Sequence, residues 1–115
     1  MGIADSLKKG TVELLILKLL QERDMYGYEI TQALQDKSQG YFILQEGSLY
    51  PTLYRMLDRG LISDHQELVG RRRTRVYYHL EDAGREKYAL IRDEYISLNK
   101  GIMNVIGADV SPEEN

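Results

Sequence analysis

Residues 46–62 constrain the fold of this chain more than any other stretch, because they predict a short helix with two contrasting faces. Apolar residues recur there at i, i+4, i+7 and i+8, which places their side chains on one side of an α-helix, facing a core. These residues are Leu49, Leu53, Met56 and Leu57. Proline is best tolerated in the first helical turn, so Pro51 predicts a helix that begins near Ser48, its N-cap, and ends before Gly60.

The opposite face of this predicted helix carries small, flat or cationic groups, whereas an ordinary solvent face is rich in lysine and glutamate. The helix N-terminus adds free N–H groups and the positive end of the helix dipole, and Gly47 and Ser48 leave room for a phosphate to approach. We interpret the segment as a recognition helix for DNA. Its candidate DNA contacts are Ser48, Tyr50, Pro51, Tyr54, Arg55 and Arg59.

A predicted β-hairpin holds the second group of candidate DNA contacts. Residues 61–68 and 74–80 form its strands, and alternation in the second strand predicts a buried face. That face consists of Val76, Tyr78 and Leu80. Four arginines, Arg71, Arg72, Arg73 and Arg75, surround the turn without an acid among them. A charge run is usually a solvated surface, but these cations would repel one another unless phosphates met them, and the arginine fork suits phosphate oxygens. We therefore favour contact with DNA.

The chain as a whole is not basic, since its formal net charge is −3. This net charge argues against a uniformly basic nucleic-acid-binding protein, so DNA contact must depend on the local arginines. The 115 residues predict one domain with a modest core. No apolar run approaches the roughly 18 residues of a membrane-spanning helix, and the absence of cysteine fits a reducing compartment. We expect a cytoplasmic protein that does not bind membranes.

Two further helices are predicted ahead of the recognition helix. Residues 11–22 are apolar nearly all round, as expected of a helix packed on several sides. After a break at 23–25, residues 26–37 form an amphipathic helix, in which Gly27 permits a close approach between helices. We expect Tyr26, Tyr28 and Tyr78 to be core residues.

One long helix is predicted over residues 82–107, and it carries an apolar seam at alternating spacings of three and four. The seam consists of Tyr88, Ile91, Tyr95, Leu98, Ile102 and Val105. Such a seam packs either on the core of its own chain or on a second subunit. A second apolar stripe, which includes Ile96 and Met103, favours a homodimer, because one stripe can serve the core and the other the partner. Tyr88 and Tyr95 are candidates for a ligand pocket between the subunits.

Together these elements predict a mainly α protein with a small β-hairpin, namely a winged helix-turn-helix with a long C-terminal dimerisation helix. The predicted organisation is a DNA-binding domain over 1–80, a dimerisation helix over 81–108 and a disordered tail over 109–115. The two-fold symmetry of a dimer predicts a palindromic operator in double-stranded DNA, with half-sites about 10 base pairs, or a multiple of that, apart.

The sequence also resembles the PadR family of bacterial transcriptional regulators over residues 11–85. The resemblance lies in Tyr-Gly-Tyr-Glu-Ile at 26–30, in the run through Tyr-Pro-Thr-Leu-Tyr-Arg-Met-Leu at 47–62, and in residues 73–80 followed by Ala83-Gly84. The predicted C-terminal helix matches the family in its general character and not in a specific motif, as in short family members that have a single C-terminal helix. Ser48 and Glu81 stand where members of the family usually have threonine. Both departures affect helix capping and leave the predicted DNA-binding face unchanged. The resemblance implies a homodimeric repressor, often of detoxification or transport genes. For such a protein we expect a place in the bacterial cytoplasm, at the nucleoid. Some members release DNA on binding an aromatic or lipophilic molecule.

An enzyme is not predicted. The two histidines, His65 and His79, lie in the hairpin, where we expect them at the surface, and no spacing pairs them with a nucleophile or with metal ligands. We therefore expect no metal site and no cofactor. The main alternative function is a winged-helix module that binds proteins instead of DNA, because the same fold serves both purposes.

Overall fold

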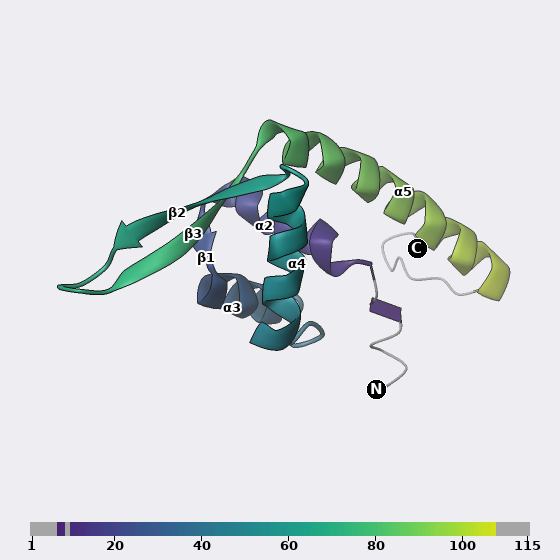
Figure 1. Cartoon of the computed structure of the whole chain (residues 1–115). Coiled ribbons are helices and arrows are strands. Elements are labelled where there is room, and N and C mark those ends of the chain that lie inside the picture. The colour runs from purple at the N-terminus through teal and green to yellow at the C-terminus, as the bar shows by residue number, and fades with distance from the viewer. Residues whose placement is uncertain (1–6, 9, 108–115) are drawn as a thin grey trace.

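Seven elements follow one another in the computed structural model, which describes residues 7–8 and 10–107 (Figure 1). They are α2 (Val12–Glu22), β1 (Met25–Tyr26), α3 (Gly27–Lys37), α4 (Glu46–Asp58), β2 (Ile62–Leu68), β3 (Thr74–Leu80) and α5 (Asp82–Ile106). The predicted disordered tail over 109–115 lies outside the described residues.

Helix α2 lies at the centre of the core. Helices α3, α4 and α5 and strand β3 all contact it, which explains why its sequence is apolar nearly all round. Its buried side chains are Leu14, Ile16, Leu17, Leu19 and Leu20. The prediction of a helix packed on several sides is confirmed.

A three-stranded antiparallel sheet adjoins these helices, with its strands in the order β1-β3-β2. Strands β2 and β3 form the predicted hairpin, and the register places Tyr78 of β3 between Met25 of β1 and Asp64 of β2. Tyr78 is buried as predicted, and burial raises the pKa of its hydroxyl to about 12. The sequence predicts only a break where β1 lies, because a two-residue strand is too short to show a period.

The predicted start of helix α4 is wrong. The helix begins at Glu46, after Gln45 as its N-cap, and the backbone N–H groups of Ser48 and Leu49 both donate to the Gln45 carbonyl oxygen at 2.9 Å. Pro51 therefore lies in the second turn, where it cannot donate to the carbonyl four residues earlier. That carbonyl belongs to Gly47. Gly47 and Pro51 are both exposed, so water can donate a hydrogen bond to the carbonyl oxygen instead.

Two predicted core residues lie at the surface. The Tyr28 side chain is 64% exposed, because it is the second residue of α3 and its ring lies outside, 6.5 Å from the ring of Tyr26 between centroids. Tyr26 itself is half-buried. Val76 is also exposed, because it lies where the hairpin extends beyond the core, whereas Tyr78 and Leu80 nearer its base are buried.

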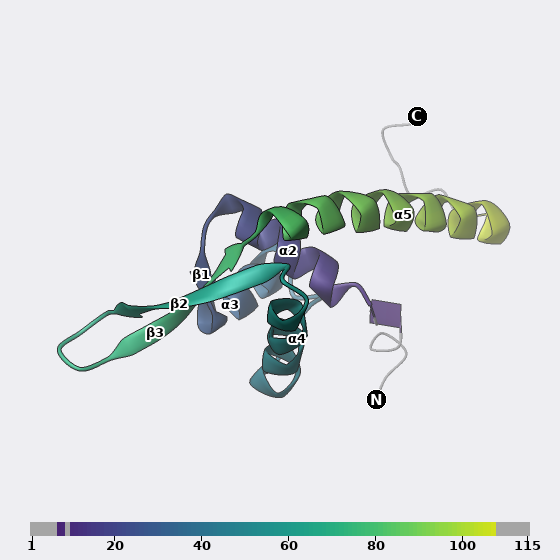
Figure 2. The ribbon, with the colours of Figure 1, turned by 45° about the horizontal axis from the view of Figure 1, so that its top comes forward.

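The hairpin and helix α5 project from the helical body in different directions (Figures 1 and 2). The radius of gyration is 16.2 Å, and the molecule measures 56 × 28 × 28 Å. A compact domain of this length would have a radius of gyration of roughly 13 Å. The two projections therefore offer surfaces that the chain does not cover itself.

The arrangement is a winged helix-turn-helix, as predicted. Helices α3 and α4 form the helical pair, strands β2 and β3 form the wing, and the rest of the fold is mainly α-helical. No helix in the described part of the chain is long and apolar enough to cross a membrane.

Candidate nucleic-acid interface

Helix α4 has the two faces that its sequence predicts. Its buried side chains are Leu49, Thr52, Leu53 and Met56. Four of the predicted DNA contacts, Ser48, Pro51, Tyr54 and Arg55, are exposed. The outer face of α4 is therefore open to a partner while its apolar stripe fixes the helix on the core.

The Arg55 side chain is aligned along this outer face. Its Nη2 donates a hydrogen bond to the Thr52 hydroxyl oxygen at 3.2 Å, and that hydroxyl donates to the Ser48 carbonyl oxygen at 3.0 Å. A guanidinium group has five N–H donors, and these bonds use only one of them. Arg55 is thus partly pre-oriented and keeps most of its donors for another molecule.

Two other predicted contacts of this helix have partners within the chain. The Tyr50 ring packs against Gly27 of α3, and a Cβ atom at Gly27 would collide with the Tyr50 hydroxyl. Burial is the main cause that raises the pKa of this hydroxyl. Arg59 pairs with Glu13 of α2, with Nη1 3.1 Å from Oε2. Both side chains therefore help to hold α4 against its neighbours.

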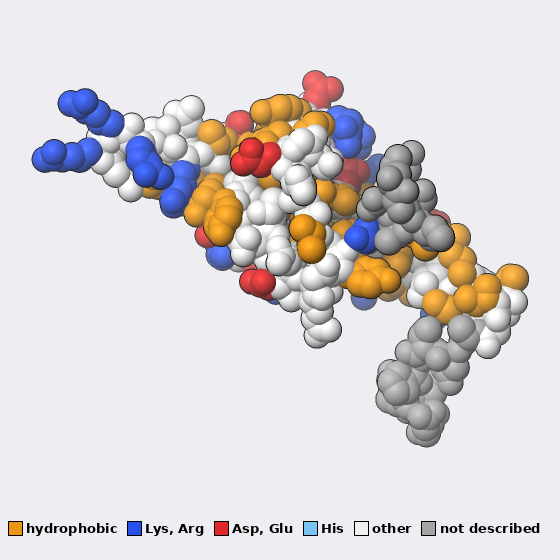
Figure 3. All heavy atoms as spheres, turned by 90° about the horizontal axis from the view of Figure 1, so that it is seen from below, with side chains coloured by type: hydrophobic (Ala, Val, Ile, Leu, Met, Phe, Trp, Pro, Cys, Tyr) orange, Lys and Arg blue, Asp and Glu red, His pale blue; other side chains and the backbone are white. Residues whose placement is uncertain are grey.

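The wing carries its positive charge at its far end. Arg71, Arg72 and Arg73 are all exposed, and the backbone N–H of Val69 donates to the Arg73 carbonyl oxygen at 2.9 Å, which closes the turn. In the view from below, the blue side chains gather at the tip of the wing (Figure 3). Their concentration at one projecting end gives a cationic surface on a chain with net negative charge.

Arg75, the fourth arginine of the hairpin, differs from the other three. It is half-buried, and its guanidinium carbon lies 4.2 Å from the centre of the Tyr26 ring. That geometry is a cation–π contact between the wing and the strand that precedes α3.

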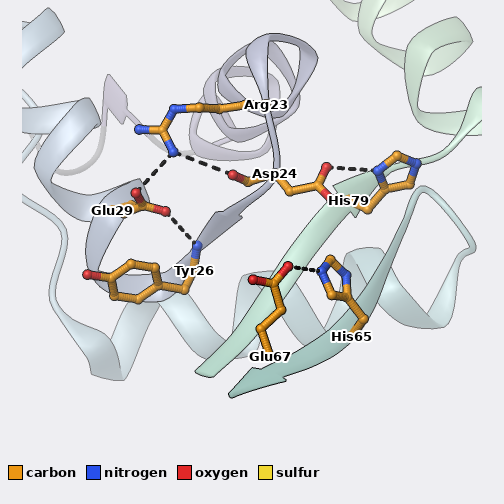
Figure 4. Close-up of polar contacts among 7 residues, drawn as sticks. All are labelled: Arg23, Asp24, Tyr26, Glu29, His65, Glu67 and His79. Carbon is orange, nitrogen blue, oxygen red and sulfur yellow. Dashed lines mark hydrogen bonds and ion pairs between the residues drawn. The ribbon is translucent and has the colours of Figure 1, made fainter. Parts of the chain in front are cut away.

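The two histidines are exposed, as predicted, and each contacts a carboxylate, that of Glu67 on β2 or that of Asp24 just before β1 (Figure 4). The His65 Nε2 lies 2.9 Å from Glu67, and the His79 Nδ1 lies 2.8 Å from Asp24. Among the described residues, no group of three or more histidines and carboxylates is arranged to hold a metal ion.

The predicted seam of α5 divides into two parts. Tyr88 and Ile91 pack against the core of their own chain. The remaining residues are exposed, with exposed fractions of 44% for Tyr95, 62% for Leu98, 46% for Ile102 and 86% for Val105. The intramolecular alternative therefore accounts for the first part of the seam, and the second part is an apolar surface.

A groove of about 420 Å³ lies between α5, α2 and the segments that precede α2 and α4. It is lined by Leu7, Lys8, Thr11, Leu14, Leu15, Tyr41, Phe42 and Tyr95. The Lys8 ammonium nitrogen lies 5.0 Å from the Phe42 ring centre. Tyr95 lines this groove, whereas Tyr88 belongs to the core. The other walls were not predicted from the sequence, because they come from distant segments. The one local signal was the aromatic pair Tyr41 and Phe42, of which Tyr41 is exposed and Phe42 is partly buried.

Taken together, the fold, the open face of α4 and the cationic wing define a winged helix-turn-helix protein. The family model of the transcriptional regulator PadR-like family matches residues 16–90. The chain therefore belongs to the PadR-like family of transcriptional regulators, as its sequence predicts.

Solved structures agree with this assignment. A PadR family transcription regulator from Clostridium difficile R20291 is 31% identical, with a TM-score of 0.70 over 86% of this chain and 100% of that chain. A transcriptional regulator from Clostridium thermocellum is 29% identical, with a TM-score of 0.78 over 86% of this chain and 95% of that chain.

The name of one further relative states its function. The negative transcriptional regulator PadR of Bacillus subtilis is 26% identical over 72 residues, which cover 63% of this chain and 40% of that protein. The match thus spans less than half the length of this relative. The family and these relatives are regulators of transcription, not enzymes.

Proposed function

We propose that this chain is a homodimeric repressor that binds a palindromic operator in double-stranded DNA. The observation that carries the proposal is the pairing of an open outer face on α4 with a wing tip of three exposed arginines. The arginine fork suits phosphate oxygens, which favours DNA over a protein partner. The proposed place of action is the nucleoid in the bacterial cytoplasm.

The two basic elements have different proposed roles. Helix α4 enters the major groove, where the Arg55 fork reaches guanine O6 and N7 while Ser48, Pro51 and Tyr54 lie against the DNA. The arginines at the wing tip meet phosphates or the adjacent minor groove. Tyr50 and Arg59 contribute through their contacts within the chain, which hold α4 in place.

The proposed dimer uses the exposed second part of the α5 seam. Leu98, Ile102 and Val105 together form an apolar strip on a helix that projects from the body. A two-fold contact between two such strips would bury the apolar surface of both. It would also place two copies of α4 in successive turns of the major groove.

Substitution of the two kinds of arginine tests these roles. Arg55→Ala should weaken binding to the specific operator by about 1–3 kcal/mol and leave binding to random duplex nearly unchanged, because a base contact is lost. Arg72→Ala should weaken both duplexes alike and lower the salt slope of binding by roughly one, because a phosphate contact is lost. Fluorescence anisotropy titrations at several salt concentrations measure both effects.

If Arg55→Ala weakens operator and random duplex equally, α4 is positioned by phosphates, and the sequence is read by Ser48 or Tyr54. If neither substitution alters binding, the chain is better explained as a module that binds proteins.

The proposed inducer is an aromatic or lipophilic compound that binds at the groove beside Tyr95 and lowers DNA affinity. Such a compound must bind more weakly to the DNA complex than to the free protein. By thermodynamic linkage, the ratio of these two affinities equals the factor by which the compound lowers DNA affinity. Tyr95→Ala should weaken compound binding, while Tyr28→Ala, an exposed tyrosine outside the groove lining, should not. Calorimetric titration of free protein and complex gives both affinities. A compound that binds both equally is not an inducer.

A further inference from the structure

We infer that Arg75 is a positioning residue that sets the angle of the wing relative to the helical pair, and that it does not itself contact DNA. This inference rests on the proposed DNA-binding function. It gives Arg75 a different role from Arg71, Arg72 and Arg73, although the sequence pattern alone places all four arginines in one group.

The cation–π contact joins two different parts of the fold. Arg75 lies on β3, in the wing, and its guanidinium carbon is 4.2 Å from the centre of the Tyr26 ring on β1. The register pairs Tyr26 with Tyr77, two residues along β3 from Arg75 and therefore on the same face of the sheet. Arg75 thus reaches back from the wing across the neighbouring strand.

The Tyr26 ring belongs to a row of rings across the three strands. Tyr77 of β3 meets Tyr26 edge-on, with ring centres 5.4 Å apart, and His65 of β2 stacks on Tyr77 at 5.8 Å. These contacts follow the register, in which Tyr77 lies opposite both Tyr26 and His65. The row therefore ties both strands of the wing to β1 on the outer face of the sheet.

Tyr26 is in turn fixed to the first turn of α3 (Figure 4). Its backbone N–H donates to Glu29 Oε1 at 3.2 Å, and Glu29 Oε2 accepts from Arg23 at 3.0 Å. The partner of Arg75 is thus the residue that precedes helix α3. Through Tyr26, the orientation of the wing is coupled to the helical pair that carries the outer face of α4.

Such a coupling matters because an isolated two-stranded hairpin is only marginally stable in water, and this one extends beyond the core. Its orientation must therefore be fixed at its base. When the contact is lost, a smaller fraction of molecules holds the wing in the binding orientation, and the apparent DNA affinity falls in proportion to that fraction.

The test compares substitutions at both ends of the contact in the full chain. Arg75→Ala should weaken operator binding about three- to fivefold, the range expected for loss of a partly exposed cation–π contact. Tyr26→Leu should weaken it at least as much, because it also removes the edge contact with Tyr77. The double variant should bind no more weakly than Tyr26→Leu alone, because the cation–π contact is already lost in that variant. Tyr26→Phe, which keeps the ring face, should bind like the original chain.

The salt dependence separates positioning from phosphate contact. Arg75→Ala should leave the salt slope of binding unchanged, whereas Arg72→Ala should lower it by roughly one. The inference is overturned if Arg75→Ala lowers the slope by one while Tyr26→Leu binds normally, because Arg75 would then be a phosphate contact.

A measurement without DNA keeps the inference testable apart from the proposed function. Amide hydrogen exchange in β2 and β3 should be faster in Arg75→Ala than in the original chain, and unchanged in Arg72→Ala. Equal exchange in both variants would overturn the inference. If the original chain binds no duplex DNA but the exchange differs as expected, the proposed function fails while the role of Arg75 in fixing the wing stands.

Discussion

Leu98→Arg is expected to convert the proposed dimer into monomers. Leu98 is 62% exposed in the single chain and lies in the apolar strip that the proposed dimer buries. An unpaired arginine there costs more than about 2 kcal/mol per copy, and a two-fold interface contains two copies. Dimer affinity should therefore fall by roughly a thousandfold, and sedimentation velocity at micromolar concentration should show monomers.

A matched control is Leu90→Arg, the same substitution at an equally exposed leucine of α5, 67% against 62%. Eight residues separate the two positions, so Leu90 lies about 80° around the helix and outside the seam. This variant should remain a dimer. A dimer that survives Leu98→Arg would show that the exposed part of the seam is not the interface.

Gly84→Ala should destabilise the fold by about 3 kcal/mol and lower the melting temperature by roughly 12–20 °C. Gly84 is buried in the first turn of α5, where an added Cβ would overlap the Leu61 carbonyl oxygen and lie 2.6 Å from a methyl carbon of Leu80. A backbone carbonyl cannot rotate away as a long side chain can. The helix would have to shift, and with it the direction in which α5 leaves the body.

Thermal denaturation followed by circular dichroism measures this effect, and Gly47→Ala is its control. An added Cβ at Gly47 meets nothing within 4 Å, and Gly47 lies in helix α4. That substitution should raise stability by about 0.5 kcal/mol, because alanine favours the helix. Equal melting temperatures for Gly84→Ala and the original chain would mean that α5 does not depend on this close approach.

The elements that sequence periodicity predicts are those with long, regular patterns. Helix α2, helix α5 and the hairpin are all found where the apolar spacing places them. Strand β1 is missed because its two residues show no period, and it forms by pairing with a strand about 50 residues away. The predicted start of α4 is wrong because Pro51 lies in the second turn instead of the first. A proline there loses one backbone hydrogen bond and crowds the carbonyl four residues earlier, and the burial of Leu49, Leu53 and Met56 offsets that cost.

The candidate site was predictable where it depends on one face of one element. The exposed side of α4 and the exposed arginines of the wing tip follow from local pattern. The partners of Arg59, Tyr50 and Arg75 do not, because Glu13, Gly27 and Tyr26 lie 46, 23 and 49 residues away along the chain. Exposed positions therefore follow from the sequence more readily than the contacts that tie some of these side chains into the fold.

The central claim is that α4 and the wing read a two-fold symmetric site on duplex DNA. Selection of bound molecules from a pool of random duplexes tests it most directly. The selected sequences should contain an inverted repeat whose half-sites lie about 10 base pairs, or a multiple of that, apart. Enrichment of a single asymmetric half-site would contradict the dimer, and a pool that shows no enrichment would contradict sequence-specific binding itself.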